Sequence, residues 1–209
     1  MLSVKEPPAP GRPRRKARLS PFQKQVLFYA LFMMPLVSDL LEMAHSPDHA
    51  RAVVEQQHKL GLYAFRFLLS SLLVSPLRRF ARVDFMVYRR PLGLLAFTYA
   101  LIHAAFYLVD ITHLNTERLR HDFMTHPLFV FGLLALLLLS VLAVTSTRGA
   151  IRHMGWRWAR LHRLVYVAAV LASVHFCLAF RTWHVEAFIY AGVTMAILAL
   201  RWLPPRRGV

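Results

Sequence analysis

Cysteine and acidic side chains are scarce in this sequence. The single cysteine, Cys177, excludes an intrachain disulfide framework, a CxxC redox pair, a cysteine-rich zinc site and the CxxCH motif of c-type cytochromes. Charged residues make up 17% of the 209 residues, against roughly 25% in a soluble domain. Because 57% of the residues are hydrophobic, the composition argues against a water-soluble globule.

Long hydrophobic runs take the place of a soluble core. A helix that crosses the ~30 Å hydrocarbon layer of a membrane needs ~20 apolar residues. Six runs meet this length: 26–43, 60–77, 91–109, 127–147, 161–180 and 185–203. Since the connections are short, we predict an all-α membrane protein, a bundle of six transmembrane helices over residues 22–203. Residues 1–21 are predicted to be a disordered basic arm and residues 204–209 a short tail.

Basic residues gather on one side of the predicted membrane. Twenty of the 26 Lys and Arg residues lie in the N-terminal segment, the second and fourth connections and the tail. The positive-inside rule therefore predicts that both termini are cytoplasmic. It also explains the formal charge of +16 without nucleic acid. Residues 1–21 lack the apolar core of a signal peptide, so no cleavage is expected.

Few polar side chains lie inside the predicted spans, where such groups are costly and usually functional. They are Asp39, Glu42, Arg66, His103, His162 and His175. His103 and His175 lie six and five residues before the ends of their spans, which places them ~9 and ~8 Å below the same surface. Two imidazoles at matched depth on separate helices can fill both axial positions of a b-type haem. The alternative is that each histidine bonds to a neighbouring helix as a packing group.

A second site on the cytoplasmic side is less complete. His162 lies 13 residues before His175, and 13 residues of ideal helix end about 220° beyond three turns. The residue 14 before His103 is Arg89, whose guanidinium is a poor iron ligand. An inner haem would therefore have one histidine ligand or be absent. The alternative for His162 is an interfacial position among lipid headgroups.

Several segments resemble the MsrQ family, formerly YedZ, between about residues 22 and 201. They are Gly61-Leu62-Tyr63-Ala64, Arg90-Pro91-Leu92-Gly93-Leu94 leading to His103, Thr145-Ser146-Thr147, and Leu161-His162-Arg163-Leu164-Val165-Tyr166 leading to His175. That family is the haem-binding membrane subunit of the bacterial MsrPQ system, which repairs methionine sulfoxide in periplasmic proteins. It belongs to the ferric reductase-like transmembrane superfamily.

The resemblance implies a multi-pass protein of the bacterial inner membrane that carries haem b. His103 and His175 would bind the outer haem, with His162 an inner ligand or near-ligand and Arg89 replacing a fourth histidine. The number of haems, one or two, stays open. The resemblance also implies FMN, a quinone or flavin reductase as electron donor, and a periplasmic molybdenum-dependent methionine sulfoxide reductase as partner.

Other residues have two interpretations. Arg66 either pairs with a haem propionate or extends its guanidinium to the membrane interface. The basic residues Arg148, Arg152, Arg157 and Arg160 either contact a flavin phosphate or only set topology. The third connection, 110–126, is the longest outward surface and is predicted to dock the partner.

Two other function classes remain as alternatives. One is a stand-alone transmembrane ferric or quinone reductase, and the other is a small non-redox transporter. A membrane hydrolase is disfavoured because the sequence has neither HExxH nor GxSxG.

Overall fold

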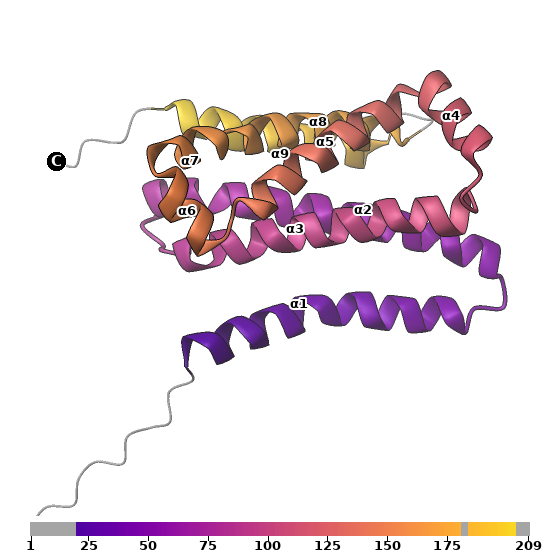
Figure 1. Cartoon of the computed structure of the whole chain (residues 1–209), viewed down its shortest axis with the longest axis horizontal. Helices are drawn as coiled ribbons and strands as arrows, with labels where there is room; N and C mark the ends of the chain where they lie inside the picture. The colour runs from indigo at the N-terminus through magenta and orange to yellow at the C-terminus, as the bar shows by residue number, and fades with distance from the viewer. Residues whose placement is uncertain (1–19, 181–183, 204–209) are drawn as a thin grey trace, which may run out of the picture.

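The computed structural model describes residues 20–180 and 184–203, and all regular structure within them is helical (Figure 1). The helices are α1 (Pro21–Ala44), α2 (His49–Pro76), α3 (Met86–Phe106), α4 (Thr116–Thr125), α5 (Pro127–Val144), α6 (Arg148–Met154), α7 (Trp156–Leu161), α8 (Leu164–Leu178) and α9 (Val185–Trp202). Short π-helical turns, η1 (Leu77–Ala81) and η2 (Tyr107–Ile111), extend α2 and α3. The predicted basic arm, apart from residues 20 and 21, and the tail lie outside the described residues.

Five helical segments are long and apolar enough to cross a membrane. They are Phe22–Ala44, His49–Ala81, Met86–Ile111, Pro127–Val144 and Trp156–Leu178. This confirms an all-helical, multi-pass membrane architecture for the part of the chain that the structure describes. The sixth predicted span coincides with α9, whose crossing stays a prediction, as does the placement of both termini in the cytoplasm.

Helix α2 begins well before the apolar run that predicted it. It starts at His49 instead of residue 60, after Asp48, whose side chain accepts a hydrogen bond from the Arg51 amide. Its 28 residues make a helix of about 42 Å, longer than the ~30 Å hydrocarbon layer. Hydropathy locates contact with lipid and does not mark where a polar helix begins. The first turns of α2 therefore precede the apolar run and carry polar side chains such as Arg51, Glu55 and Lys59.

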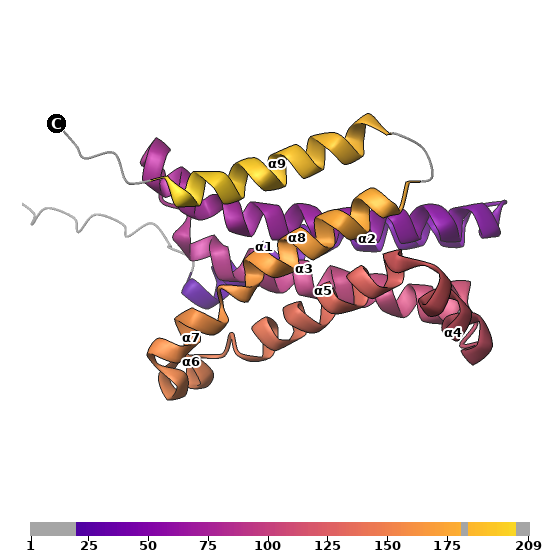
Figure 2. The same ribbon diagram turned by 90° about the horizontal axis from the view of Figure 1, so that it is seen from above.

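Two closely packed helix pairs form the centre of the bundle. Helix α2 packs along α3, and α5 packs along α8, while contacts between α3 and α5 and between α2 and α8 join the pairs (Figure 2). Helices α3 and α8 are therefore diagonal to each other. Helix α9 covers α8 and α2, and α1 lies outside against α2 and α3.

The two ends of the bundle differ in charge. The basic end, where α6 and α7 lie, carries the arginines Arg78, Arg79, Arg82, Arg89, Arg90, Arg148, Arg152, Arg157, Arg160, Arg163 and Arg201. The acidic end, where α4 lies, carries eight of the ten acidic residues, Asp39, Glu42, Asp48, Glu55, Asp110, Glu117, Asp122 and Glu186. This asymmetry follows the charge pattern of the sequence.

Small side chains let the central helices approach. Ala96, Ala168 and Ala169 have no exposed surface and meet Leu68 and Leu72 of α2 in the main core. Close contact between small residues is a general source of helix association in membranes, where lipid competes with apolar side chains. Large apolar side chains face outward in return, such as Met34, which is 68% exposed. The outside of the bundle thus suits lipid.

Tyr99 joins α1 to the bundle. Its ring has no exposed surface, and its hydroxyl donates a 2.7 Å hydrogen bond to the carbonyl oxygen of Phe32. Phe32 lies one turn before Pro35, whose missing amide interrupts the hydrogen bonds of α1. The ring of Tyr63 packs edge-on against Tyr99.

We expect Tyr99→Phe to lower the free energy of unfolding by about 1–2 kcal/mol, since it removes one buried hydrogen bond and keeps the ring. Thermal unfolding of the purified protein in detergent measures this loss. Tyr88→Phe is the matched control, because Tyr88 stacks on Phe28 and its hydroxyl has no hydrogen bond among the described residues. Equal stability of the two variants would show that the Tyr99 bond does not hold α1.

Candidate functional site

The structure brings His103 and His175 together in the middle of the bundle. His103 lies near the end of α3 and His175 near the end of α8, the two diagonal helices. Their ring centres are 6.1 Å apart, and the ring planes are at 87° to each other. His103 and His175, which lie at matched distances from the ends of their predicted spans, are thus neighbours in the structure.

Each of these rings is held through its Nδ1 atom by a neighbouring helix. His103 Nδ1 lies 2.9 Å from the carbonyl oxygen of Gln57 on α2. His175 Nδ1 lies 2.8 Å from the carbonyl oxygen of Leu128 on α5. A carbonyl oxygen only accepts hydrogen bonds, so each Nδ1 carries a proton and each neutral ring has its lone pair on Nε2. Neither Nε2 has a hydrogen-bond partner within the described parts of the chain.

A glycine lies under each ring, and sequence reasoning gave neither glycine a role at the site, although Gly61 begins one of the segments that resemble the family. Gly61 follows Gln57 by one helical turn on α2, and Gly132 follows Leu128 by one turn on α5. A Cβ at Gly61 would lie 3.0 Å from Cε1 of His103, and a Cβ at Gly132 would lie 2.6 Å from Nδ1 of His175. The missing side chains therefore let each ring reach its carbonyl. A signal was present, because both glycines lie inside apolar spans, where glycine often marks close helix approach.

These residues fit the binding of a haem iron. A protein-bound metal often has histidine ligands whose second nitrogen donates to a backbone carbonyl, which fixes the tautomer and the ring direction. Bonds between imidazole nitrogen and a transition metal are about 2.0–2.1 Å long. Two ring centres 6.1 Å apart are therefore near enough for both imidazoles to hold one metal ion. No cluster of three or more His, Cys, Asp or Glu occurs in residues 20–180 and 184–203, so a metal centre built from protein side chains alone is not formed there.

His162 has a different environment at the basic end. It caps α7, and its ring stacks on Trp158 with 4.0 Å between ring centres. Its Nε2 lies 3.1 Å from the hydroxyl of Thr145, which itself donates to the carbonyl of Val141. Because a hydroxyl has one proton to give, His162 Nε2 is the donor in this pair. In this arrangement Nε2 of His162 has a hydrogen-bond partner, whereas Nε2 of His103 and of His175 has none within the described residues.

The chain between His162 and His175 is not one ideal helix. Helix α7 ends at Leu161 and α8 starts at Leu164, with a turn between them. Both residues of the turn keep right-handed helical dihedral angles, and the Tyr166 amide bonds to the Arg163 carbonyl three residues earlier, as in a tighter helical turn. The rotation between His162 and His175 therefore departs from that of an ideal α-helix at this turn.

Arg89 and Arg66 occupy separate places. Arg89 lies in the first turn of α3, close enough for its charge to act on His162 and Arg201. The two residues predicted as inner counterparts, Arg89 and His162, thus share the basic end. Arg66 donates through Nε to the hydroxyl of Tyr190, at 2.7 Å, and joins α2 to α9. A role for Arg66 toward a propionate stays a prediction.

The arginines predicted as flavin contacts lie on α6 and α7. Arg148 and Arg152 are on α6, and Arg157 and Arg160 are on α7. Arg160 lies 4.2 Å above the ring of Trp156, which is 63% exposed. Trp158 instead donates to the carbonyl of Thr145 and so fixes α7 against α5.

The predicted docking connection contains an ordered helix. Helix α4 begins after Asn115, whose side chain accepts from the Arg118 amide, and is amphipathic and mostly exposed. The Tyr107 hydroxyl donates a 2.6 Å hydrogen bond to Asp122 and anchors α4 to the end of α3. This hydrogen bond lowers the pKa of the Asp122 carboxyl. The connection is therefore a positioned surface at the acidic end.

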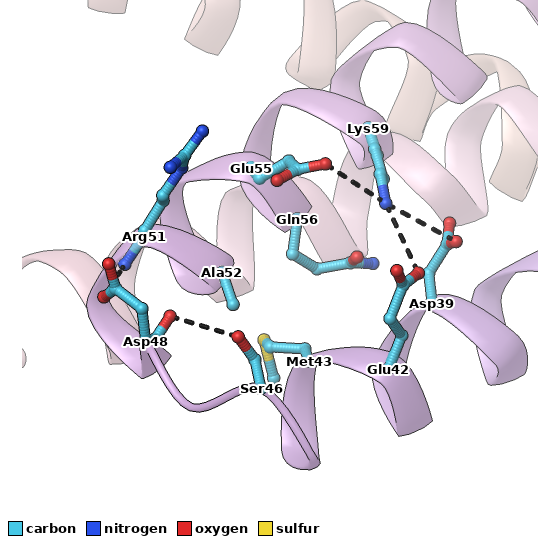
Figure 3. A pocket seen from close by; sticks show the side chains of 10 residues that line it. All are labelled: Asp39, Glu42, Met43, Ser46, Asp48, Arg51, Ala52, Glu55, Gln56 and Lys59. Atoms are coloured by element: carbon cyan, nitrogen blue, oxygen red, sulfur yellow. Dashed lines mark hydrogen bonds and ion pairs between the residues drawn. The ribbon is translucent and has the colours of Figure 1, made fainter.

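A polar pocket of about 280 Å³ lies at the acidic end between α1 and α2 (Figure 3). The amino group of Lys59 is 3.5–3.9 Å from three carboxylates, those of Asp39, Glu42 and Glu55. Gln56, which is 2% exposed, has an amide nitrogen without a partner beside them. The next residue, Gln57, holds His103, so this pocket and the paired imidazoles share one stretch of α2.

Comparison with known proteins identifies relatives of this chain. A family model described as the ferric reductase like transmembrane component matches residues 60–173, from α2 to just before His175. The protein named "Protein-methionine-sulfoxide reductase heme-binding subunit MsrQ" of Brucella anthropi is 41% identical over 179 residues, which cover 86% of this chain and 81% of the relative. Proteins of the same name from Brucella ovis and Brucella canis are each 39% identical over 193 residues, which cover 92% of this chain and 88% of the relative.

We expect Gly132→Ala to weaken haem retention roughly 10–100-fold, the range for changes that disturb the second hydrogen bond of a metal-binding histidine. Its Cβ would displace His175 from Leu128. Gly61→Ala should have a smaller effect, because its closest contact is longer. Gly192→Ala on α9 is the control, since a Cβ there meets nothing within 4 Å. Haem per chain and the absorption spectrum are the measurements, and unchanged values in Gly132→Ala would contradict the assignment.

Proposed function

Because the chain belongs to the MsrQ family of ferric reductase-like transmembrane proteins, we propose that it is a b-type cytochrome that passes electrons to a methionine sulfoxide reductase. The relatives are named as heme-binding subunits of that reductase. One observation supports this most: two imidazoles on diagonal helices, 6.1 Å apart, each fixed through Nδ1 and free at Nε2.

The residues of the chain would act by orientation and by exclusion of water. The Gln57 and Leu128 carbonyls hold the rings of His103 and His175 in one tautomer. Haem, bound by these two nitrogens, would supply a one-electron carrier within the bundle. Apolar helices around the site keep solvent away, which suits electron transfer and leaves no room for chemistry on a large substrate. Reduction of the sulfoxide would therefore take place on the partner subunit.

The acidic end is the side proposed for electron exit. It carries α4 and lies beyond the ends of α3 and α8 that hold His103 and His175. By the positive-inside rule this end faces the periplasm and the basic end faces the cytoplasm of a bacterial inner membrane. A molybdenum-dependent, MsrP-like reductase would dock there. The donor would be the quinone pool or a flavin reductase, with FMN as a second cofactor and His162 as the inner position for a second haem.

A stand-alone ferric or quinone reductase is the second candidate. It uses the same paired imidazoles and requires no docked partner. The ordered helix α4, anchored by Tyr107 to Asp122, favours the partnered function, since it provides a fixed surface near the exit side.

We expect His103→Ala and His175→Ala to abolish the low-spin haem spectrum or to convert it to high spin, because each removes one axial nitrogen. His162→Ala should leave this component in place and remove a further component only if a second haem is bound. His153→Ala, exposed on α6, is the control. A reduced-minus-oxidised spectrum with haem and FMN content per chain is the measurement. A normal spectrum in both His103 and His175 variants would exclude the pair as ligands.

We expect the pre-reduced protein to be reoxidised by an MsrP-like reductase with a sulfoxide substrate, with stoichiometric loss of sulfoxide. Removing charge from the docking surface, as in Asp110→Asn with Glu117→Gln, should slow this reaction several-fold at low ionic strength and less at high salt. Asp84→Asn at the basic end is the control, because asparagine keeps the oxygen that accepts from the Met86 amide. Reoxidation no faster than in buffer would favour the stand-alone reductase.

A further inference from the structure

A second cavity, of about 210 Å³, lies at the basic end between three helices. It is lined by Ser75 and Pro76 at the end of α2, Arg79 of η1, Tyr166 of α8, and Leu200 and Arg201 of α9. None of these residues belongs to the paired-imidazole site. The cavity lies where α2 and α9 come to an end.

Arg201 is a fixed part of the wall of this cavity. One terminal nitrogen of its guanidinium donates to the carbonyl of Leu72, at 2.6 Å, and the other donates to the hydroxyl of Tyr166. The guanidinium carbon also lies 4.9 Å from the Tyr166 ring centre. Its Nε is buried and has no partner among the described atoms. The guanidinium is therefore fixed in the wall of the cavity, and its positive charge has no carboxylate partner among the described residues.

Positive charge in and near the cavity is uncompensated. Arg79 lines the same space, and the charge of Arg89 acts on Arg201. Among the described residues, Asp84 is the one carboxylate at the basic end, and its side chain accepts from the Met86 amide. The ion pairs of the described chain involve Lys59, Arg120 and His121, all at the acidic end. Arg79 and Arg201 thus line one cavity that has no carboxylate in its lining, and guanidinium groups bind phosphate through charge-assisted hydrogen bonds.

Size and surroundings restrict the anion. Pockets that take a drug-sized molecule have volumes of about 300–1,000 Å³, so this cavity suits a phosphate-sized headgroup and not a tricyclic ring. Basic pockets between membrane helices bind the headgroups of anionic lipids. Phe80, which follows Arg79 on η1, is 38% exposed, and α9 carries exposed apolar side chains such as Met195 further along its length. These side chains provide a surface for acyl chains.

We propose that this cavity binds the phosphate of an anionic phospholipid, with Arg79 and Arg201 as phosphate contacts and the acyl chains along α9. The single negative charge of the bound phosphodiester would offset part of the charge of the two guanidinium groups and stabilise the packing of α9 against α2 and α8. The same phosphate chemistry occurs in free flavin mononucleotide and in inorganic phosphate, so the test must separate these sources.

The test is thermal unfolding and native mass spectrometry of the full-length protein in detergent, titrated with phosphatidylglycerol or phosphatidylcholine. We expect phosphatidylglycerol to raise the Tm and to remain bound in the mass spectrum, and phosphatidylcholine to do so much less. Arg79→Gln should weaken phosphatidylglycerol binding roughly fivefold, as expected for ~1 kcal/mol per basic residue at an anionic surface. Arg79→Lys should restore most of the loss.

Arg152→Gln on α6 is the control, because it removes one exposed positive charge at the same end but outside the cavity. Arg201→Gln is less informative because it also removes the bonds to Leu72 and Tyr166. The proposal is overturned if both lipids stabilise equally, or if Arg79→Gln and Arg152→Gln lose equal affinity. It is also overturned if flavin mononucleotide or inorganic phosphate, each added to the lipid-bound protein at a concentration similar to that of the lipid, fully displaces the lipid.

Discussion

The second lone pair of a helical carbonyl is the feature on which the central site depends. The Gln57 and Leu128 carbonyls lie on α2 and α5, where the first lone pair of such an oxygen serves the helix. Each also accepts from an imidazole, and it is reachable because the residue one turn later is glycine. A polar ring in lipid surroundings must satisfy its donor, and here a neighbouring helix does so without a polar side chain.

A hydrogen bond from an imidazole to the backbone carbonyl of a neighbouring helix requires the two helices of each pair to pack closely. His103 can reach Gln57 because α3 packs along α2, and His175 can reach Leu128 because α8 packs along α5. The diagonal placement of α3 and α8 then turns the two rings toward the same space. Contacts between the pairs are fewer, as they must be if a flat group is to lie between the rings.

Sequence reasoning located the membrane helices and the central histidines but not the groups that orient them. Apolar length was sufficient for the five candidate spans that the structure shows, while the sixth span and the orientation from charge asymmetry stay predictions. Equal depth was sufficient to bring out His103 and His175 as neighbours. Gly61 and Gly132 were missed because a glycine in an apolar run has no chemistry of its own until the facing side chain is known. The polar start of α2 at His49 and the turn before Leu164 were missed because hydropathy and ideal rotation do not register caps or breaks. Helix α4 was missed because a short polar helix resembles a loop in composition.

The division of the bundle into two pairs has a consequence for assembly. Each pair is continuous in sequence, α2 to α3 and α5 to α8, so each forms from local contacts soon after its helices enter the membrane. Every half then already contains one histidine, one carbonyl and one glycine in register. The two helix pairs would pack together in a later step. A group held by both His103 and His175 would thus link the two halves of the bundle after each half has formed.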